Sequence, residues 1–211
     1  MYKYFIKIPW IVKKLFPDYI WNIPTHEKAV YLTFDDGPHP QVTPWVLQQL
    51  KEYNALATFF CIGNYVKQYP DVFNQVLTDG HSTGNHTQHH LNGWQTSNTE
   101  YFKDISQASH FIKSNLFRPP YGKIKTKQAK NIANALGEMN AKIIMWDVLS
   151  ADFDVLASKE ECLSNVLNNV TPGSVVVFHD SEKAFKNLEY ILPLVLKTLQ
   201  KQNYQFKKIV L

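Results

Sequence analysis

The sequence has only two cysteines, Cys61 and Cys162, among its 211 residues. A chain of this length buries roughly 70% of its unfolded surface, so it does not need disulfides to fold. We therefore expect two unpaired thiols, with a single disulfide as the alternative. No stretch approaches the ~20 consecutive apolar residues that cross a bilayer, which excludes a transmembrane helix.

Runs of basic residues are also missing, and 22 lysines and arginines against 18 acidic residues leave a net charge of only +4. This balance disfavours a nucleic-acid-binding surface. No glycine-rich loop opens a predicted helix, which disfavours a phosphate or dinucleotide site. What the chain does have is 45% hydrophobic residues, with 13 Phe, 11 Tyr and 5 Trp. That composition excludes disorder, and the length indicates one large domain with at most a small appendage.

The first 24 residues read MYKYFIKIPWIVKKLFPDYIWNIP. Lysines and prolines interrupt the apolar run that a secretory signal requires, so we expect no cleavable signal and, by default, a cytoplasmic location. The favoured hypothesis is that residues 1–27 pack as an aromatic segment against the domain formed by residues 28–211. The alternative is peripheral membrane contact by an interfacial helix, with lysines at the headgroups and the following side chains on lipid: Trp10, Ile11, Leu15 and Phe16.

From residue 29 onward, strand-like and helix-like segments alternate. Strands are predicted at 29–34, 57–62, 81–84, 117–118, 141–146, 174–178 and 205–210. Helices are predicted from Thr43–Pro44, from 70 to 77, 100 to 116 and 127 to 136, after a Ser158–Glu161 capping box, and from 188 to 199 around Pro193. Seven strands alternating with helices predict a parallel α/β fold, either an open sheet or a closed barrel.

Uncommon polar residues follow the ends of these predicted strands. They are Asp35 and Asp36 after the first strand, His86 and His90 after the third, Arg118 in the fourth, Asp152 after the fifth, and His179 at the end of the sixth. In α/β barrels, functional side chains from different strands gather at the carboxyl ends of the strands. The sequence therefore predicts one functional rim.

Three histidines crowd the segment NHTQHHL, residues 85–91. His86 and His90 are four residues apart, so a helical turn would place both imidazoles on one face. Two imidazoles and one carboxylate form a three-ligand site with open positions, which is typical of catalytic zinc. His89 and His81 are alternative ligands, and surface histidines are the simpler interpretation of the pair taken alone.

Asp35 and Asp36 are neighbours and cannot both point the same way, so one could bind a metal while the other acts as a general base. The alternative is an Asp-Gly-Pro turn in which both carboxylates cap backbone N–H groups. Arg118 could pair with a carboxylate and keep it ionised, or form an ordinary salt bridge. His179 and Asp152, taken singly, could be a rim histidine and a loop acid.

Taken in order, TFDDGP, HTQHH, RPPYG, the acidic loop after MWDVLSADF, and VFHD resemble the five motifs of polysaccharide deacetylases, the NodB homology domain or carbohydrate esterase family 4. The resemblance covers roughly residues 28–211, which would then be the catalytic domain. It implies an α/β fold of the distorted (β/α)7 barrel type. It also implies a metal-dependent hydrolase that removes N-acetyl groups, with O-acetyl groups as the alternative, from an oligo- or polysaccharide.

The resemblance also implies roles for individual residues. The metal ligands would be Asp36, His86 and His90, holding Zn²⁺, or Co²⁺ or Ni²⁺, since a His₂Asp set suits all three. Asp35 would be the general base, tethered by Arg118, and His179 the general acid, supported by Asp152. Substrate contacts would come from the Tyr121 backbone N–H, which would help hold the oxyanion, and from Pro120, Trp146 and Val177.

The chain departs from the family pattern at the wall of the expected pocket. Leu149 and Phe153 replace an acid and a tryptophan of the fourth motif, Val177 replaces a leucine of the fifth, and Leu91 stands where proline is common. These changes affect the substrate more than the reaction. Trp94, Trp146 and Phe153 are candidates for stacking on a sugar ring, with core packing as the alternative. A non-catalytic carbohydrate-binding relative and an amidase for a small non-sugar amide remain alternative hypotheses.

Overall fold

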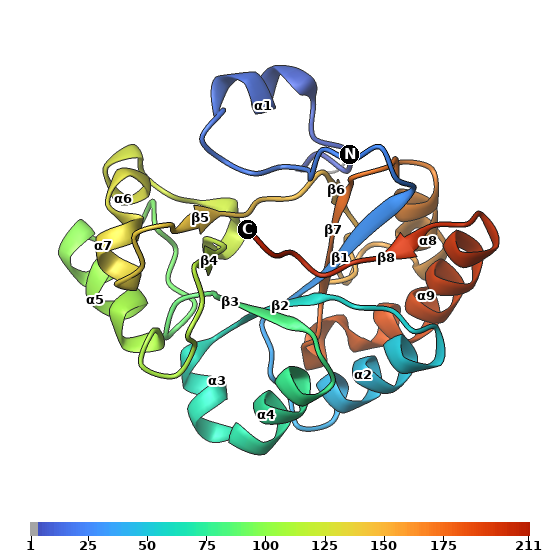
Figure 1. The fold of residues 1–211 in the computed structure, drawn as a ribbon, viewed down its shortest axis with the longest axis horizontal. Coiled ribbons are helices and arrows are strands. Elements are labelled where there is room, and N and C mark those ends of the chain that lie inside the picture. Colours follow the sequence, from blue (N-terminus) through green and yellow to red (C-terminus); the bar gives the residue numbers. More distant parts are fainter. Residues whose placement is uncertain (1–3) are drawn as a thin grey trace.

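The computed structural model describes residues 4–211 and shows a curled sheet of parallel strands with helices packed around it (Figure 1). The strand order is β5-β4-β3-β2-β1-β7-β6, and β8 pairs with β1. The strands are β1 (Ala29–Asp35), β2 (Thr58–Cys61), β3 (Ser82–Asn85), β4 (Leu116–Phe117), β5 (Lys142–Ile143), β6 (Val148–Leu149), β7 (Val175–His179) and β8 (Gln205–Phe206). This architecture confirms the predicted barrel-like parallel α/β fold.

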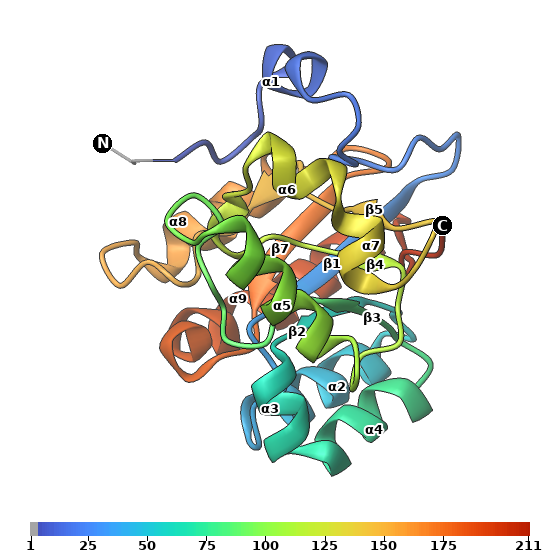
Figure 2. The same cartoon turned by 90° about the vertical axis from the view of Figure 1, so that its left-hand side faces the viewer.

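Most helices lie against the outside of the sheet, whereas α1 projects from the top of the molecule in both views (Figures 1 and 2). The helices are α1 (Trp10–Leu15), α2 (Val42–Glu52), α3 (Gly63–Gln68), α4 (Pro70–Thr78), α5 (Asn98–Ala108), α6 (Thr126–Lys130), α7 (Ile132–Leu136), α8 (Lys159–Leu167) and α9 (Glu182–Lys201). The predicted capping box opens α8, with Ser158 and Glu161 each accepting the other's backbone N–H. No helix in the described part of the chain is long and apolar enough to cross a membrane.

The main core lies between the centre of the sheet and the helices around α9. Every residue of β1 is buried, and the Phe34 ring stacks on Phe59 and Phe178 from the two neighbouring strands. One stripe of α9 with helical spacing faces this core, made of Leu188, Ile191, Leu192 and Val195. This packing fixes β1 beside β7 in a register that sets Asp35 opposite His179.

The predicted strand over 141–146 is replaced by two short strands, β5 and β6, in the segment 142–149. This segment pairs with β4 at one end and with β7 at the other. Between them, the carbonyls of Ile144 and Met145 accept hydrogen bonds from the Arg118 guanidinium at 3.1 and 2.8 Å. These carbonyls therefore face a buried side chain, which explains why the strand is interrupted.

The helix predicted over 127–136 is broken at Asn131 into α6 and α7, and it ends at Gly137 in the left-handed conformation, as expected (φ 73°). The helix predicted over 100–116 ends at Ala108, whereas α9 continues through Pro193. Cys61 and Cys162 are buried free thiols, which confirms that expectation.

The N-terminal segment lies along the 142–149 segment. The amide of Ile20 donates to the Ile143 carbonyl at 2.9 Å, and that of Leu149 donates to the Ile6 carbonyl at 2.8 Å. The ammonium groups of Lys7 and Lys13 contact the Asp147 carboxylate at 2.5 and 2.6 Å. These contacts hold the segment on the barrel, while a domain boundary at residue 27 stays a prediction.

Candidate active site

At the carboxyl end of β1, two neighbouring carboxylates point in different directions. Asp35 is the last residue of β1 and is 4% exposed. Asp36 follows with φ 80°, in the left-handed region that non-glycine residues rarely adopt. The change of backbone conformation turns the two side chains apart, so that Asp35 meets Arg118 while Asp36 meets two histidines.

Asp36, His86 and His90 converge, with one ligand atom from each within 4.8 Å of the others. Oδ1 of Asp36 lies 3.2 Å from Nε2 of His90 and 3.7 Å from Nε2 of His86. This oxygen is buried, and no hydrogen bond of normal geometry from residues 4–211 reaches it. A buried carboxylate oxygen facing two imidazole nitrogens fits a divalent cation with three protein ligands and open positions.

The surroundings of the two histidines also fit a metal site. Nδ1 of His86 lies 2.7 Å from the Arg118 carbonyl, and Nδ1 of His90 lies 3.1 Å from the Tyr121 hydroxyl. Such outer contacts leave Nε2 of each ring available as the ligand. Burial lowers the pKa of His86 to about 4, against the opposing charge of Asp35. His86 is therefore a neutral imidazole, the form that binds a metal.

The electrostatics of Asp36 favour the carboxylate. Burial alone would raise its pKa, but the contact with His90 and the charge of His179 outweigh burial and lower the pKa below its usual range. Asp36 therefore offers an anionic ligand between two nitrogen ligands.

The helical turn expected for His86–His90 is wrong. The segment after β3 is an irregular loop in which Thr87 and His90 have φ values of 66° and 57°. Asp104 of α5 holds this loop by accepting the amides of Gln88 and His89. The two imidazoles meet because of this loop geometry and not because of a four-residue helical spacing.

The two alternative histidines lie elsewhere. His89 is bound through Nδ1 to Asp104 at 2.6 Å, and its side chain is 55% exposed. His81 precedes β3, at the amino end of that strand, where Nδ1 accepts the Ala57 amide at 3.1 Å. Neither belongs to the group formed by Asp36, His86 and His90, which we call the Asp36 cluster.

Arg118 is fully buried and fixes Asp35. Its Nη1 donates to Oδ1 of Asp35 and to Oγ1 of Thr33, both at 2.7 Å. The guanidinium carbon lies 4.1 Å from the centre of the Phe60 ring. Its other two nitrogens donate to the carbonyls of Ile144 and Met145. Arg118 therefore contacts Asp35 through one nitrogen, and the pair is not bidentate.

His179 and Asp152 form a second buried pair. Nδ1 of His179 lies 2.8 Å from Oδ1 of Asp152, and the His179 amide donates to Oδ2 at the same distance. Burial would lower the pKa of His179, but the charge and hydrogen bond of Asp152 outweigh it and raise the pKa to about 9. His179 is therefore an imidazolium at neutral pH, the form able to donate a proton.

One pocket of about 480 Å³ is lined by Asp35, Asp36, His86, His90 and His179, whereas Arg118 and Asp152 are buried and do not line it. Its walls include the residues that depart from the family pattern, Leu149, Phe153 and Val177, together with Trp146 and Tyr121. The Phe153 ring meets the His179 ring edge-on, with centroids 5.0 Å apart. The Tyr121 amide has no acceptor within residues 4–211, so it is free to bind a ligand.

Two of the expected substrate contacts lie outside this pocket. Pro120 is buried behind Tyr121 and does not line the cavity. Trp94 is 60% exposed, and its indole N–H donates to the Ile124 carbonyl at 3.1 Å. Trp94 lies in a turn and Pro120 begins a short 3-10 helix (Pro120–Gly122), and neither position could be read from the sequence.

Sequence reasoning missed Asp180, which follows His179 directly. Its side chain is fully buried, accepting the Gly37 amide at 3.1 Å and the Thr43 hydroxyl at 2.5 Å. Its own amide donates to the Asp35 carbonyl at 3.0 Å. A Cβ on Gly37 would lie 2.1 Å from this carboxylate, so the turn after Asp36 requires glycine. The acid that follows the histidine in the VFHD motif is the sequence feature that could have indicated this residue.

Tyr4 was also missed. It lines the pocket from the N-terminal segment and donates a hydrogen bond to Asp154 at 2.6 Å. Nothing in the local sequence indicates a contact across 150 residues.

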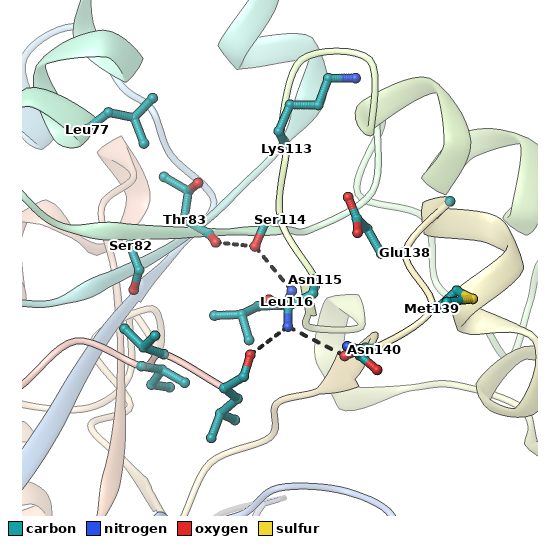
Figure 3. A pocket seen from close by; sticks show the side chains of 14 residues that line it. Leu77, Ser82, Thr83, Lys113, Ser114, Asn115, Leu116, Glu138, Met139 and Asn140 are labelled. Carbon is teal, nitrogen blue, oxygen red and sulfur yellow. Dashed lines mark hydrogen bonds between the residues drawn. The ribbon is translucent and has the colours of Figure 1, made fainter.

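A larger hollow of about 730 Å³ lies at the amino ends of the strands, at the opposite end of the barrel (Figure 3). Ser82 and Leu116 begin β3 and β4 there, and Ser114 donates to the Thr83 carbonyl. Glu138 is the only acidic side chain among its lining residues, and no histidine or cysteine is present among them. This hollow therefore has no set of metal ligands comparable to the Asp36 cluster.

The chain is similar in sequence to known proteins. The family model described as polysaccharide deacetylase matches residues 22–141. A chitooligosaccharide deacetylase of Azorhizobium caulinodans is 38% identical over 166 residues, covering 75% of this chain and 77% of that protein. A peptidoglycan-N-acetylglucosamine deacetylase of Bacillus cereus is 34% identical over 192 residues, covering 88% of each chain.

Among solved structures, the Bc1960 peptidoglycan N-acetylglucosamine deacetylase in complex with 4-naphthalen-1-yl-N-oxidanyl-benzamide superimposes with a TM-score of 0.85. It is 29% identical, and the match covers 96% of this chain and 95% of that one. The similarity therefore extends over almost the whole chain.

Proposed function

This chain belongs to the polysaccharide deacetylase family, and we propose that it hydrolyses the N-acetyl groups of a saccharide containing N-acetylglucosamine. The observation that carries the proposal is the shared pocket of Asp35, the Asp36 cluster and His179. The relatives named above act on chitooligosaccharide and on peptidoglycan, and both substrates carry this acetamido sugar.

Asp36, His86 and His90 would hold the cation, and Zn²⁺ is the proposed ion. When bound, the cation supplies Lewis acidity toward the acetyl carbonyl. Three tasks remain for the protein residues: two proton transfers and the stabilisation of the negative charge on the carbonyl oxygen.

Asp35 is the proposed general base. Arg118 holds one carboxylate oxygen through a 2.7 Å hydrogen bond, which leaves the other available to take a proton from the attacking water. The new bond joins the water oxygen to the acetyl carbon. Negative charge then grows on the carbonyl oxygen, and the unpaired Tyr121 amide is a suitable donor for it.

His179 is the proposed general acid. The C–N bond breaks as the imidazolium transfers its proton to the departing nitrogen, so an amine and acetate leave. Asp152 keeps the imidazole protonated and oriented for this step through the 2.8 Å contact with Nδ1. Without this proton the amine is a poor leaving group.

Acetate release from a panel of acetylated saccharides tests the proposal. We expect release from oligomers of N-acetylglucosamine or from peptidoglycan, loss of release after chelation, and recovery when Zn²⁺ is returned. Co²⁺ and Ni²⁺ are added in parallel, because a His₂Asp set accepts all three ions. Saccharide binding without acetate release under every condition would instead support the non-catalytic alternative.

A further inference from the structure

Helix α1 and the residue after it expose an unusual concentration of large apolar side chains. Trp10, Ile11, Leu15 and Phe16 are 65%, 49%, 69% and 47% exposed. We call these four residues the N-terminal apolar patch. Single exposed apolar residues are normal on proteins, but four within seven positions form a patch that needs a partner surface.

The segment is held so that two of its lysines face inward and this patch faces outward. Lys7 and Lys13 reach the Asp147 carboxylate, which is 2% exposed and also accepts the Ser174 hydroxyl at 2.5 Å. Val12 packs against the core cluster around Trp21. Surface helices normally turn their apolar side to the core and their lysines to water. In α1 none of the six residues is buried.

The charge of the segment indicates what covers the patch. The first 26 residues contain four lysines and a single acid, Asp18; with Asp147, which pairs with Lys7 and Lys13, a charge of +2 remains (4 − 1 − 1). Lys14 is exposed, and its ammonium lies 4.7 Å from the centre of the Trp10 ring. A positively charged segment on a chain of net charge +4 repels a second copy of itself and attracts an anionic surface. Tryptophan beside lysine is typical of segments at the headgroup level of a bilayer.

The position of α1 leaves the patch accessible. In both views the helix stands out from the top of the molecule, beyond the helices that surround the sheet (Figures 1 and 2). Tyr4, in the same segment, lines the catalytic pocket, so the segment connects the patch to the rim of the site.

We propose that the N-terminal apolar patch docks on an anionic lipid surface, with its four side chains at the acyl boundary and Lys14 at the phosphates. A short apolar patch assisted by a few lysines gives reversible, peripheral binding. The proposal is independent of the proposed deacetylase activity, because none of the patch residues lines the catalytic pocket.

Cosedimentation of the full chain with vesicles tests the docking. Vesicles of phosphatidylcholine alone are compared with vesicles of phosphatidylcholine and phosphatidylglycerol, at low and high salt. We expect binding to the anionic vesicles that weakens with salt. Trp10→Ser combined with Leu15→Ser should lower the partition coefficient at least tenfold. Lys14→Gln should lower it about fivefold on anionic vesicles only.

Val155→Ser combined with Leu156→Ser provides the matched control. These residues are 75% and 90% exposed and lie outside the patch and the pocket, so vesicle binding should be unchanged. Equal binding by the wild type and the Trp10/Leu15 variant, or no binding to anionic vesicles, overturns the proposal. Light scattering that shows a dimer dissociated by the same variant would also overturn it, because a second copy would then cover the patch.

Discussion

The substitution Asp152→Asn tests how the site keeps His179, the proposed general acid, protonated. In the structure Asp152 contacts both the ring and the backbone amide of His179 at 2.8 Å. The resulting rise in the pKa of His179 from 6.5 to about 9 corresponds to roughly 3 kcal/mol in favour of the imidazolium. Burial acts in the opposite direction, and the Asp152 carboxylate is the largest cause of the rise, with smaller contributions from the charges of Asp36 and Asp35.

Asparagine keeps the shape of Asp152 but removes its charge. The pKa of His179 should then fall from about 9 toward its ordinary value of 6.5. Because the general acid must be protonated, activity is present below the pKa of His179 and is lost as the pH rises through it. The alkaline limb of the kcat/KM profile should therefore move to lower pH, with roughly tenfold lower activity near pH 7.5. Acidification should recover part of this loss.

The profile is measured by acetate release over a pH series for wild type and variant, both loaded with the same cation. Asp154→Asn is the control, because it removes an acid from the same loop, and no hydrogen bond or ion pair between Asp154 and His179 is present in the described chain. Its alkaline limb should coincide with that of the wild type. An unchanged limb in Asp152→Asn would refute the assignment of Asp152 as the group that sets the pKa of His179.

Three further substitutions test other parts of the structure. Asp35→Asn should lower kcat by about 10²–10⁴-fold, while calorimetry with Zn²⁺ still shows binding; loss of metal binding would contradict the division of roles. Asp180→Ala should weaken Zn²⁺ binding about tenfold, because the turn that presents Asp36 loses its support. Thr43→Val keeps the Gly37 contact and should retain the affinity; equal losses in both variants would argue against this support. Asp147→Ala leaves two lysines without their buried partner and should destabilise the chain by about 3 kcal/mol in denaturant melts.

The fold class was readable from the sequence because its signals are local. An apolar run ending in two acids predicted β1 and its rim position, and the Ser158–Glu161 capping box marked the start of α8. The 141–146 segment misled the prediction because its apolar residues are buried, as in a strand. Two of its carbonyls, however, accept hydrogen bonds from Arg118, which lies more than twenty positions earlier in the chain.

The candidate site was predicted unevenly for the same reason. The motifs identified Asp36, His86 and His90 as a set, but the helical turn used to bring the histidines together does not exist. Left-handed residues at Thr87 and His90, held by Asp104, make the contact instead. The preference for a left-handed backbone at these positions comes from tertiary hydrogen bonds, which residue type alone does not reveal.

The sequence by itself determined which residue types stand at the ends of the strands, because burial periodicity and caps act over a few residues. The tertiary structure alone decided their convergence: Asp35 meets Arg118 across 83 positions, and Asp180 supports Gly37 across 143. It also decided that Lys7 and Lys13 turn inward to Asp147, leaving the N-terminal apolar patch outside. Those contacts depend on how the sheet curls and which elements become neighbours, and the whole chain must fold before either is set.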